Sequence, residues 1–182
     1  MSPDAIGATR HLVLVGLMGA GKSTVGARCA ERLGRPFVDT DDLVVDQAGM
    51  PVDEIFRRAG EERFRELERG VIADVCASPA ALVIASGGGA IVDADNRRRL
   101  REAGVVVWLH APTEVLVSRV GNDSGRPLLA GDPHGALARL GAARQDAYSA
   151  AADRIVETEG RDLDAVADAV IAAFEEVNGV AS

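Results

Sequence analysis

The sequence predicts a three-layer α/β/α fold in which helices cover both faces of a five-stranded parallel sheet. Two observations lead to this class. Strand-like apolar runs alternate with helical segments along the whole chain, and the first run is apolar in the manner of strands buried on both faces. Strands separated by helices form right-handed βαβ units, which make the strands parallel. We expect a single domain over residues 1–182, with a core at about 11–176 and flexible ends.

The first strand and the first helix enclose a glycine-rich segment. The strand is His11–Val15, and the helix is marked by an apolar stripe at Val25, Cys29 and Leu33. Between them, residues 16–24 read GLMGAGKST and match G-x-x-x-x-G-K-[ST], the P-loop that cradles phosphates. A chance match is the alternative, but strand, glycine loop and helix is the order that this motif requires. The sequence therefore predicts a P-loop fold that binds a nucleoside triphosphate.

Lysine is rare in this chain. Of its 20 Lys and Arg residues, Lys22 is the single lysine, and it stands inside the motif. A compact ammonium on a flexible stem can fold over the β- and γ-phosphates, where a planar guanidinium would not fit. We therefore expect Lys22 to be catalytic. The residues expected to hold the nucleotide phosphates are Gly19, Ala20, Gly21, Lys22, Ser23 and Thr24.

The second strand is short and is followed by helices. Arg35–Asp39 is the strand, and Asp42–Ala59 forms one or two helices that are interrupted at Gly49–Pro51. A longer helix over Glu61–Ala77 comes next, because its apolar positions fall on one face. These positions are Phe64, Leu67, Val71 and Val75.

The third and fourth strands complete the predicted centre of the sheet. Ala81–Ser86 is the third strand and runs into a triple glycine, Gly87–Gly89. The polar helix Asp93–Ala103 connects it to the fourth strand, Val105–Leu109, and a helix over Pro112–Val120 follows.

A loop rich in turn residues separates this helix from the last part of the chain. It runs from Gly121 to Gly135 and contains glycines suited to hinges, so we expect a lid at about 121–135. A helix then continues to about Ala152, and Arg154–Glu157 is the fifth strand. The final helix packs on the sheet through Leu163, Val166, Val170, Phe174 and Val177.

Acidic residues follow the second strand at the carboxyl edge of the sheet, where folds of this class bind their ligands. They are Asp39 and Asp41, with Thr40 between them. Beside a P-loop, one carboxylate can help to hold Mg²⁺ while the other accepts or orients the proton of a substrate hydroxyl. The alternative is structural, with Thr40 or Asp41 only capping the next helix.

Three more features have both a functional and a structural interpretation. Gly87–Gly89 form either an ordinary flexible turn or a surface where a ligand lies against bare backbone and its N–H groups. Arg65 either binds a ligand or pairs with a neighbouring glutamate. Arg126, in the predicted lid, suits a residue that covers the phosphates, excludes water and neutralises transition-state charge.

Charge and composition exclude several partners. With 20 basic against 28 acidic residues, the net charge of −8 argues against a nucleic-acid partner. No apolar run approaches membrane-spanning length and the N-terminus lacks a signal pattern, so we expect a cytoplasmic protein with no membrane partner, and a monomer. Cys29 and Cys76 are expected as small core residues in a reducing compartment, and the three histidines show no metal-ligand spacing.

Taken in order, these segments resemble the shikimate kinases, within the nucleoside-monophosphate-kinase-like P-loop proteins. The resemblance covers roughly Leu12–Phe174. Its motifs are residues 16–24, Asp39-Thr40-Asp41, Phe64-Arg65, Gly87–Gly89, Arg126-Pro127-Leu128-Leu129, and Arg144 with Tyr148. It implies a kinase that uses ATP and Mg²⁺ to phosphorylate the 3-hydroxyl of shikimate, a step toward chorismate and the aromatic amino acids.

The resemblance also implies residue roles. Asp41 contacts the shikimate hydroxyls and acts as the base, while Ser23 and Asp39 belong to the Mg²⁺ site. Arg65 and Arg144 clamp the shikimate carboxylate, and the pocket around it is lined by Gly87, Gly88 and Gly89. Phe56 and Phe64 are apolar walls of the shikimate site. On the nucleotide side, Arg126 reaches the phosphates, Arg119 stacks on the adenine, and Thr158 lies near the base.

One stretch departs from the family pattern. The adenine loop of the family usually reads Ile/Val-Asp-Thr with a proline a few residues later, whereas residues 155–161 here read IVETEGR, which leaves the base contacts near Thr158 open. Other functions also stay open. Gluconate kinases and nucleoside monophosphate kinases share the architecture, and the acidic motif with Phe64-Arg65 argues against them. A non-catalytic ATP-dependent regulator is disfavoured by the joint presence of Lys22, Asp41 and Arg126.

Overall fold

The computed structural model describes residues 10–120 and 131–179 of the chain. Its elements are, in order, β1 (His11–Val15), α1 (Lys22–Leu33), β2 (Phe37–Asp39), α2 (Thr40–Ala48), α3 (Val52–Cys76), β3 (Val83–Ala85), the 3₁₀ turn η2 (Ala90–Val92), α4 (Ala94–Ala103), β4 (Gly104–His110), α5 (Thr113–Val120), α6 (Pro133–Ala151), β5 (Arg154–Glu157) and α7 (Leu163–Asn178). No helix within these two ranges is long and apolar enough to cross a membrane.

The five strands form one parallel sheet in the order β2-β3-β1-β4-β5, which confirms the predicted fold class. β1 lies at the centre, with Leu12 opposite Val83 of β3 and opposite Val105 of β4. The chain leaves β1 toward α1 on one face and leaves β3 toward α4 on the other. Because these neighbouring loops diverge, a crevice opens between them at the carboxyl edge of the sheet.

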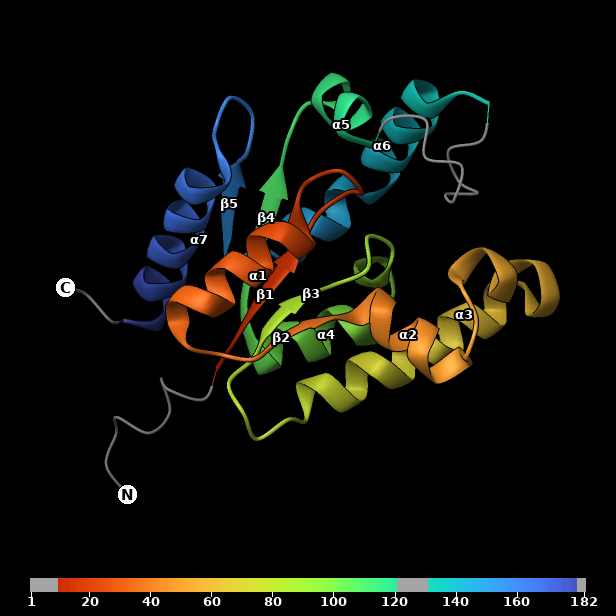
Figure 1. The fold of residues 1–182 in the computed structure, drawn as a ribbon, viewed down its shortest axis with the longest axis horizontal. Helices are drawn as coiled ribbons and strands as arrows, with labels where there is room; N and C mark the ends of the chain where they lie inside the picture. Colours follow the sequence, from red (N-terminus) through yellow and green to blue (C-terminus); the bar gives the residue numbers. More distant parts are fainter. Residues whose placement is uncertain (1–9, 121–130, 180–182) are drawn as a thin grey trace.

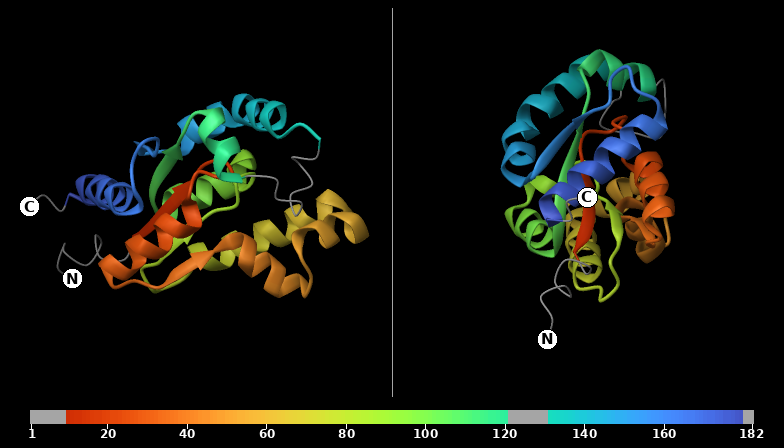
Figure 2. Two further views of the ribbon diagram at one scale, coloured as in Figure 1. Left: turned by 45° about the horizontal axis from the view of Figure 1, so that its top comes forward. Right: turned by 90° about the vertical axis from the view of Figure 1, so that its left-hand side faces the viewer.

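Two apolar cores lie on opposite faces of the sheet. Successive residues of β1 alternate between them, with Leu12 and Leu14 in the core of α1, α5 and α7, and Val13 and Val15 in the core of α3, α4 and α6. Figure 1 shows α1 and α7 side by side, and Figure 2 shows the arm formed by α2 and α3 projecting beyond the sheet. The three predicted layers are therefore present.

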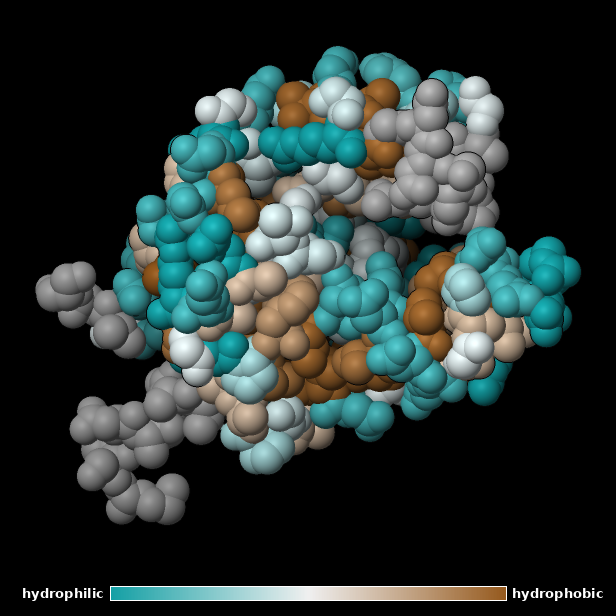
Figure 3. Space-filling view, in the orientation of Figure 1, coloured by the Kyte–Doolittle hydropathy of each residue, from teal (hydrophilic) through white to brown (hydrophobic). Residues whose placement is uncertain are grey.

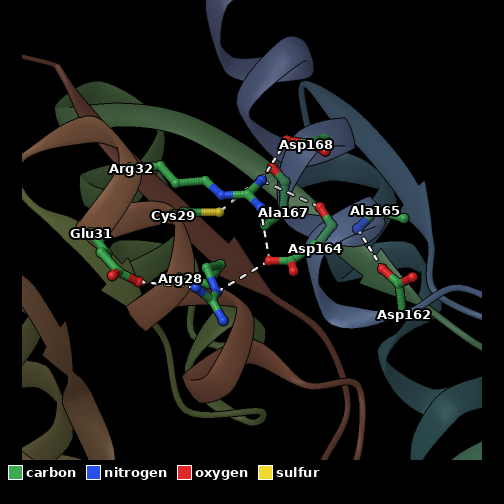
Figure 4. Close-up of polar contacts among 9 residues, drawn as sticks. All are labelled: Arg28, Cys29, Glu31, Arg32, Asp162, Asp164, Ala165, Ala167 and Asp168. Carbon is green, nitrogen blue, oxygen red and sulfur yellow. Dashed lines mark hydrogen bonds and ion pairs between the residues drawn. The ribbon is translucent and has the colours of Figure 1, made fainter.

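Polar contacts at the surface join α1 to α7 (Figure 4). Arg32 donates hydrogen bonds to Asp168 and, over 2.7 Å, to Asp164, and Arg28 lies 3.3 Å from the same Asp164. Cys29 is buried between the two helices, as predicted, and burial raises the pKa of its thiol to about 11. Because α1 begins at the phosphate-binding motif, these contacts help to hold the helix that presents it.

Two helices begin earlier than the sequence indicated. α2 begins at Thr40 rather than Asp42, because the carboxylate of Asp39 accepts a hydrogen bond from the Asp41 N–H and caps the helix. The cap is thus Asp39, and neither Thr40 nor Asp41. α6 begins at Pro133, inside the stretch predicted as loop up to Gly135, because the Asp132 side chain caps it.

The long helical stretch after β2 is broken where the sequence predicted. Gly49–Pro51 separate α2 from α3, and α3 itself bends at Gly60, whose φ of 80° lies in the left-handed region. The third strand is shorter than predicted, covering only Val83–Ala85, since the chain turns at Ser86 into the triple glycine.

Candidate functional site

A cavity of about 690 Å³ lies at the carboxyl ends of the strands. Figure 3 shows the molecule hollowed beside the α2–α3 arm. The sequence-predicted site residues that line the cavity are Gly19, Gly21, Lys22, Ser23, Thr24, Asp39, Asp41, Phe56, Phe64, Arg65, Gly88, Gly89, Arg119 and Arg144. Segments far apart in the chain thus meet here, because each follows a strand or faces the same edge of the sheet.

The phosphate-binding loop has a backbone that only glycine adopts readily. Gly19 and Gly21 have φ values of 83° and 93°, in the left-handed region. At Gly16 there is also no space, since a Cβ would lie 2.5 Å from the carbonyl oxygen of Leu109. The ammonium of Lys22 folds back over this loop and donates to the carbonyls of Gly16 (2.8 Å) and Leu17 (3.1 Å).

Ser23 and Asp39 meet at the wall of the cavity. The Ser23 hydroxyl donates to the Asp39 carboxylate over 2.5 Å, although 16 residues separate them in the chain. The other carboxylate oxygen of Asp39 caps α2. Two hard oxygen donors therefore stand together beside the phosphate loop, which is the ligand chemistry that Mg²⁺ prefers in proteins.

Asp41 lies deeper in the same cavity. Burial raises the pKa of its carboxyl group, and the negative charge of Asp39 raises it further, while Lys22 and Arg65 oppose this shift. A Cβ on Gly87 would lie 2.5 Å from an Asp41 carboxylate oxygen, so the absence of a side chain at Gly87 gives this carboxylate its place.

Arg65 and Glu68 form an ion pair that sequence reasoning did not identify in full. Arg65 donates to Glu68 over 2.9 Å and to Glu61 over 3.2 Å, so the arginine both pairs with glutamates and lines the cavity. Glu68 is almost completely buried, and burial raises the pKa of its carboxyl group against the opposing effect of Arg65. The helical spacing of three residues between Arg65 and Glu68 was the available signal.

The triple glycine brings a second arginine to the same place. A Cβ on Gly89 would lie 2.8 Å from Nη1 of Arg65 and 3.3 Å from Nη2 of Arg144, so both guanidinium groups converge on this bare backbone. Arg144 comes from α6 and is 7% exposed. Side chains from other elements hold the segment, since Thr40 Oγ1 accepts from Gly87 N (2.8 Å) and the Tyr148 hydroxyl donates to Gly88 O (2.7 Å).

An aromatic wall closes the cavity toward the α2–α3 arm. The rings of Phe56 and Phe64 lie with centroids 4.9 Å apart, and the Arg65 guanidinium lies 5.3 Å from the Phe64 ring centroid. Val52 lines the same side and was not predicted. The wall keeps one arginine against an apolar surface, where its charge is less screened than in water.

The opposite end of the cavity joins α5 to the loop after β5. Arg119 donates to the hydroxyl (2.9 Å) and the carbonyl oxygen (3.0 Å) of Thr158, and contacts the Gly19 carbonyl at 3.4 Å. A carboxylate oxygen of Glu157, where the family usually has aspartate, lies 2.8 Å from Nδ1 of His110. Arg119 and Thr158 were predicted separately, and the structure brings them together next to the phosphate loop.

Several predicted residues do not line the cavity. Ala20 and Thr158 are each 2% exposed and are not among its lining residues. Arg119, which lines the cavity, donates to the Thr158 hydroxyl. Gly87 packs against Asp41 and Glu68. Arg126 belongs to residues 121–130, outside the described part of the chain, so the predicted lid stays a prediction.

The comparison with protein families identifies the chain. The model of the family described as shikimate kinase matches residues 18–175. The chain belongs to the shikimate kinase family. Among its relatives, the shikimate kinase of Symbiobacterium thermophilum is 47% identical over 91% of this chain and 97% of its own. That of Geobacter sulfurreducens is 48% identical over 86% of both chains.

Solved structures agree with this membership of the shikimate kinase family. The shikimate kinase from Acinetobacter baumannii, solved in complex with shikimate, superimposes with a TM-score of 0.87 and 36% identity, and covers 97% of both chains. A gluconokinase from Sinorhizobium meliloti has a TM-score of 0.57 at 19% identity, and so shares the fold alone. The predicted resemblance and fold are thereby confirmed.

Proposed function

We propose that this chain transfers the γ-phosphoryl group of ATP to the 3-hydroxyl of shikimate, giving ADP and shikimate 3-phosphate. Membership of the shikimate kinase family makes it an ATP-dependent kinase. The observation that carries the proposal is the pair of guanidinium groups of Arg65 and Arg144, which converge on Gly89 in one cavity with Asp41 and Lys22. A small substrate with a carboxylate at one end and hydroxyls at the other fits this distribution of charge.

The phosphate end is formed by the P-loop. The N–H groups around Gly19 and Gly21 and the N-terminus of α1 suit the binding of anionic phosphates. Lys22 exchanges its two loop carbonyls for phosphate oxygens, where its charge opposes the charge that develops in the transition state. Arg119 and Thr158 border the adenine, and a phosphate contact by Arg126, which lies outside the described residues, stays a prediction.

Ser23 and Asp39 are the residues that would hold Mg²⁺. Their adjacent oxygens fit the ion, because P-loop proteins combine a loop hydroxyl with a nearby aspartate for this purpose. When bound, the ion neutralises charge on the β- and γ-phosphates.

The acceptor end is formed by Asp41 and the two arginines. Asp41 accepts hydrogen bonds from the substrate hydroxyls and takes the proton of the attacking one; its raised pKa makes the carboxylate a better acceptor for that proton. Arg65 and Arg144 hold the substrate carboxylate against Gly88 and Gly89, and Phe56 and Phe64 exclude water from one side.

Product identification tests the proposal. The protein is incubated with ATP and Mg²⁺ and, separately, with shikimate, gluconate or a nucleoside monophosphate, and the products are identified by mass spectrometry. We expect ADP and a phosphorylated shikimate in equal amounts. A higher kcat/KM for gluconate or the nucleotide would overturn the proposal.

A matched pair of variants tests the clamp. Arg65→Ala removes a guanidinium group from the cavity. Arg63→Ala removes a guanidinium group from the same helix, but this group is exposed and pairs with Glu66 over 2.9 Å. Losing a partner of a buried charge pair costs about 2–5 kcal/mol, so the first variant should raise the KM for shikimate at least tenfold and leave the KM for ATP nearly unchanged. The second should change neither KM. Equal kinetics in both variants would refute the clamp.

A further inference from the structure

Tyr148 is buried behind the candidate carboxylate pocket and lies outside the cavity itself. It is 1% exposed and is among the largest fully buried side chains of the described residues. Its ring stacks on Trp108, with centroids 5.2 Å apart and planes inclined by 22°. Packing alone therefore fixes the position of the ring, and the hydroxyl at its end is placed with little freedom.

The hydroxyl connects the two groups that converge on the carboxylate position. It donates to the carbonyl oxygen of Gly88 over 2.7 Å, and the guanidinium of Arg144 lies close enough to lower the pKa of the phenol against the effect of burial. A phenol has one proton to donate, and Gly88 takes it, so toward the guanidinium of Arg144 the phenol oxygen can only be an acceptor. Burial raises the pKa of the phenol to about 12, which keeps the donated proton in place across the neutral range.

The Gly88 carbonyl decides where the next N–H group points. In a trans peptide, the C=O of Gly88 and the N–H of Gly89 point in opposite directions. With the oxygen held toward Tyr148, the Gly89 N–H points away from that residue, and both Gly88 and Gly89 line the cavity. Among the hydrogen bonds of residues 10–120 and 131–179, none uses the N–H of Gly88 or Gly89, so both donors are available to a ligand.

We propose that Tyr148 is a positioning residue that aligns the Gly89 N–H and the Arg144 guanidinium for the carboxylate of the substrate. The inference rests on the proposed function and extends it, because it assigns selectivity for a carboxylate to a residue that does not contact the substrate. Linked hydrogen bonds of this kind strengthen one another in a buried setting. The carboxylate then meets the guanidinium groups of Arg65 and Arg144 together with the Gly89 N–H, and this arrangement selects a planar anion better than two flexible arginines alone.

Tyr148→Phe tests this assignment, because it removes the hydroxyl and keeps the ring that packs on Trp108. One lost hydrogen bond that orients two donors should raise the KM for shikimate about tenfold, with the KM for ATP and the kcat within about twofold of wild type. Ser78→Ala is the matched control, since it removes a hydroxyl that donates to the carbonyl of Ala80 in an exposed turn. The control should leave both KM values unchanged.

A second substrate separates positioning from a general effect on the fold. For the shikimate analogue whose carboxylate is replaced by a hydroxymethyl group, wild type and Tyr148→Phe should have the same kcat/KM, so the preference for shikimate falls about tenfold in the variant. An equal loss for both substrates, or a lower melting temperature with an unchanged KM for shikimate, would overturn the assignment. The two proposals fail in different ways. If the wild-type protein does not phosphorylate shikimate, the proposed function is wrong. If Tyr148→Phe prefers shikimate over the analogue as strongly as wild type does, only the positioning role of Tyr148 is wrong.

Discussion

Gly89→Ala should weaken shikimate binding without weakening the fold. Gly89 has φ −97° and ψ −14°, a conformation that alanine adopts without strain. The three atoms nearest to the added methyl group are the ends of two side chains, at 2.8 Å for Nη1 and 3.1 Å for Nη2 of Arg65 and at 3.3 Å for Nη2 of Arg144. The backbone conformation suits alanine, and the closest contacts fall on the two guanidinium groups.

The size of the effect follows from these distances. Ordinary contact begins at 3.4 Å, so Nη1 of Arg65 must retreat by about 0.6 Å, and Arg144 must shift slightly as well. A displacement of this size weakens a charge-assisted hydrogen bond to the substrate, and such bonds contribute about 1.5–3 kcal/mol. The KM for shikimate should accordingly rise about 10- to 100-fold. The KM for ATP should stay near its wild-type value, since the P-loop is untouched.

The assay is steady-state kinetics with each substrate varied in turn, together with thermal unfolding. Gly70→Ala is the control, because this glycine lies in α3 with no atom within 4 Å of a new Cβ. That change should stabilise the protein by about 0.5–1 kcal/mol and leave the kinetics as they are. A wild-type KM for shikimate in Gly89→Ala, with a melting temperature equal to that of wild type, would refute the placement of the carboxylate at this glycine.

Two further substitutions test the chemistry and the pH dependence of stability. Asp41→Asn removes the proposed base, and should lower kcat by about 10²–10⁴ while ATP binding measured by calorimetry stays nearly intact. His11 is 2% exposed and accepts a hydrogen bond from the Leu82 N–H, and burial lowers its pKa from 6.5. As the pH falls, His11 therefore binds a proton in the unfolded chain before it does so in the folded protein. The contribution of neutral His11 to the free energy of unfolding is complete above pH 6.5 and decreases below it. Urea unfolding from pH 7.5 to 5.5 should show a decrease in the free energy of unfolding of wild type that His11→Gln lacks. If the free energies of both proteins change with pH in parallel, the contribution of His11 is contradicted.

Features that depend on neighbours in the chain could be predicted from the sequence. The strand His11–Val15 and the strand Arg154–Glu157 have the predicted bounds, and Gly49–Pro51 break the helices as expected. The P-loop is a local motif, and its environment follows from the strand before it and the helix after it. The parallel order then brings the ends of β1, β2 and β3 to one edge, which is why the acidic pair and the triple glycine meet the loop.

Features that depend on tertiary packing could not be predicted. The spacing of three residues indicates that Glu68 can pair with Arg65, but it does not show that Glu68 is buried, because a glutamate in a charged helix is usually solvated. The Asp39 cap was missed for a similar reason, since three adjacent polar residues offer equivalent caps until the strand end is placed. Tyr148 stood in a motif without a role, and its partner Gly88 lies 60 residues away.

The arrangement of the site explains why glycine is used where the two arginines converge. Arg65 comes from α3 and Arg144 from α6, and both helices pack against the same face of the sheet. Two guanidinium groups repel each other unless acidic partners or a bound anion lie between them. Glu68 and Glu61 neutralise Arg65, and the bare backbone of Gly88 and Gly89 leaves room for an anion beside Arg144. A side chain at Gly89 would fill that room, so glycine is used at this position for the space that the anion needs and not for its backbone conformation.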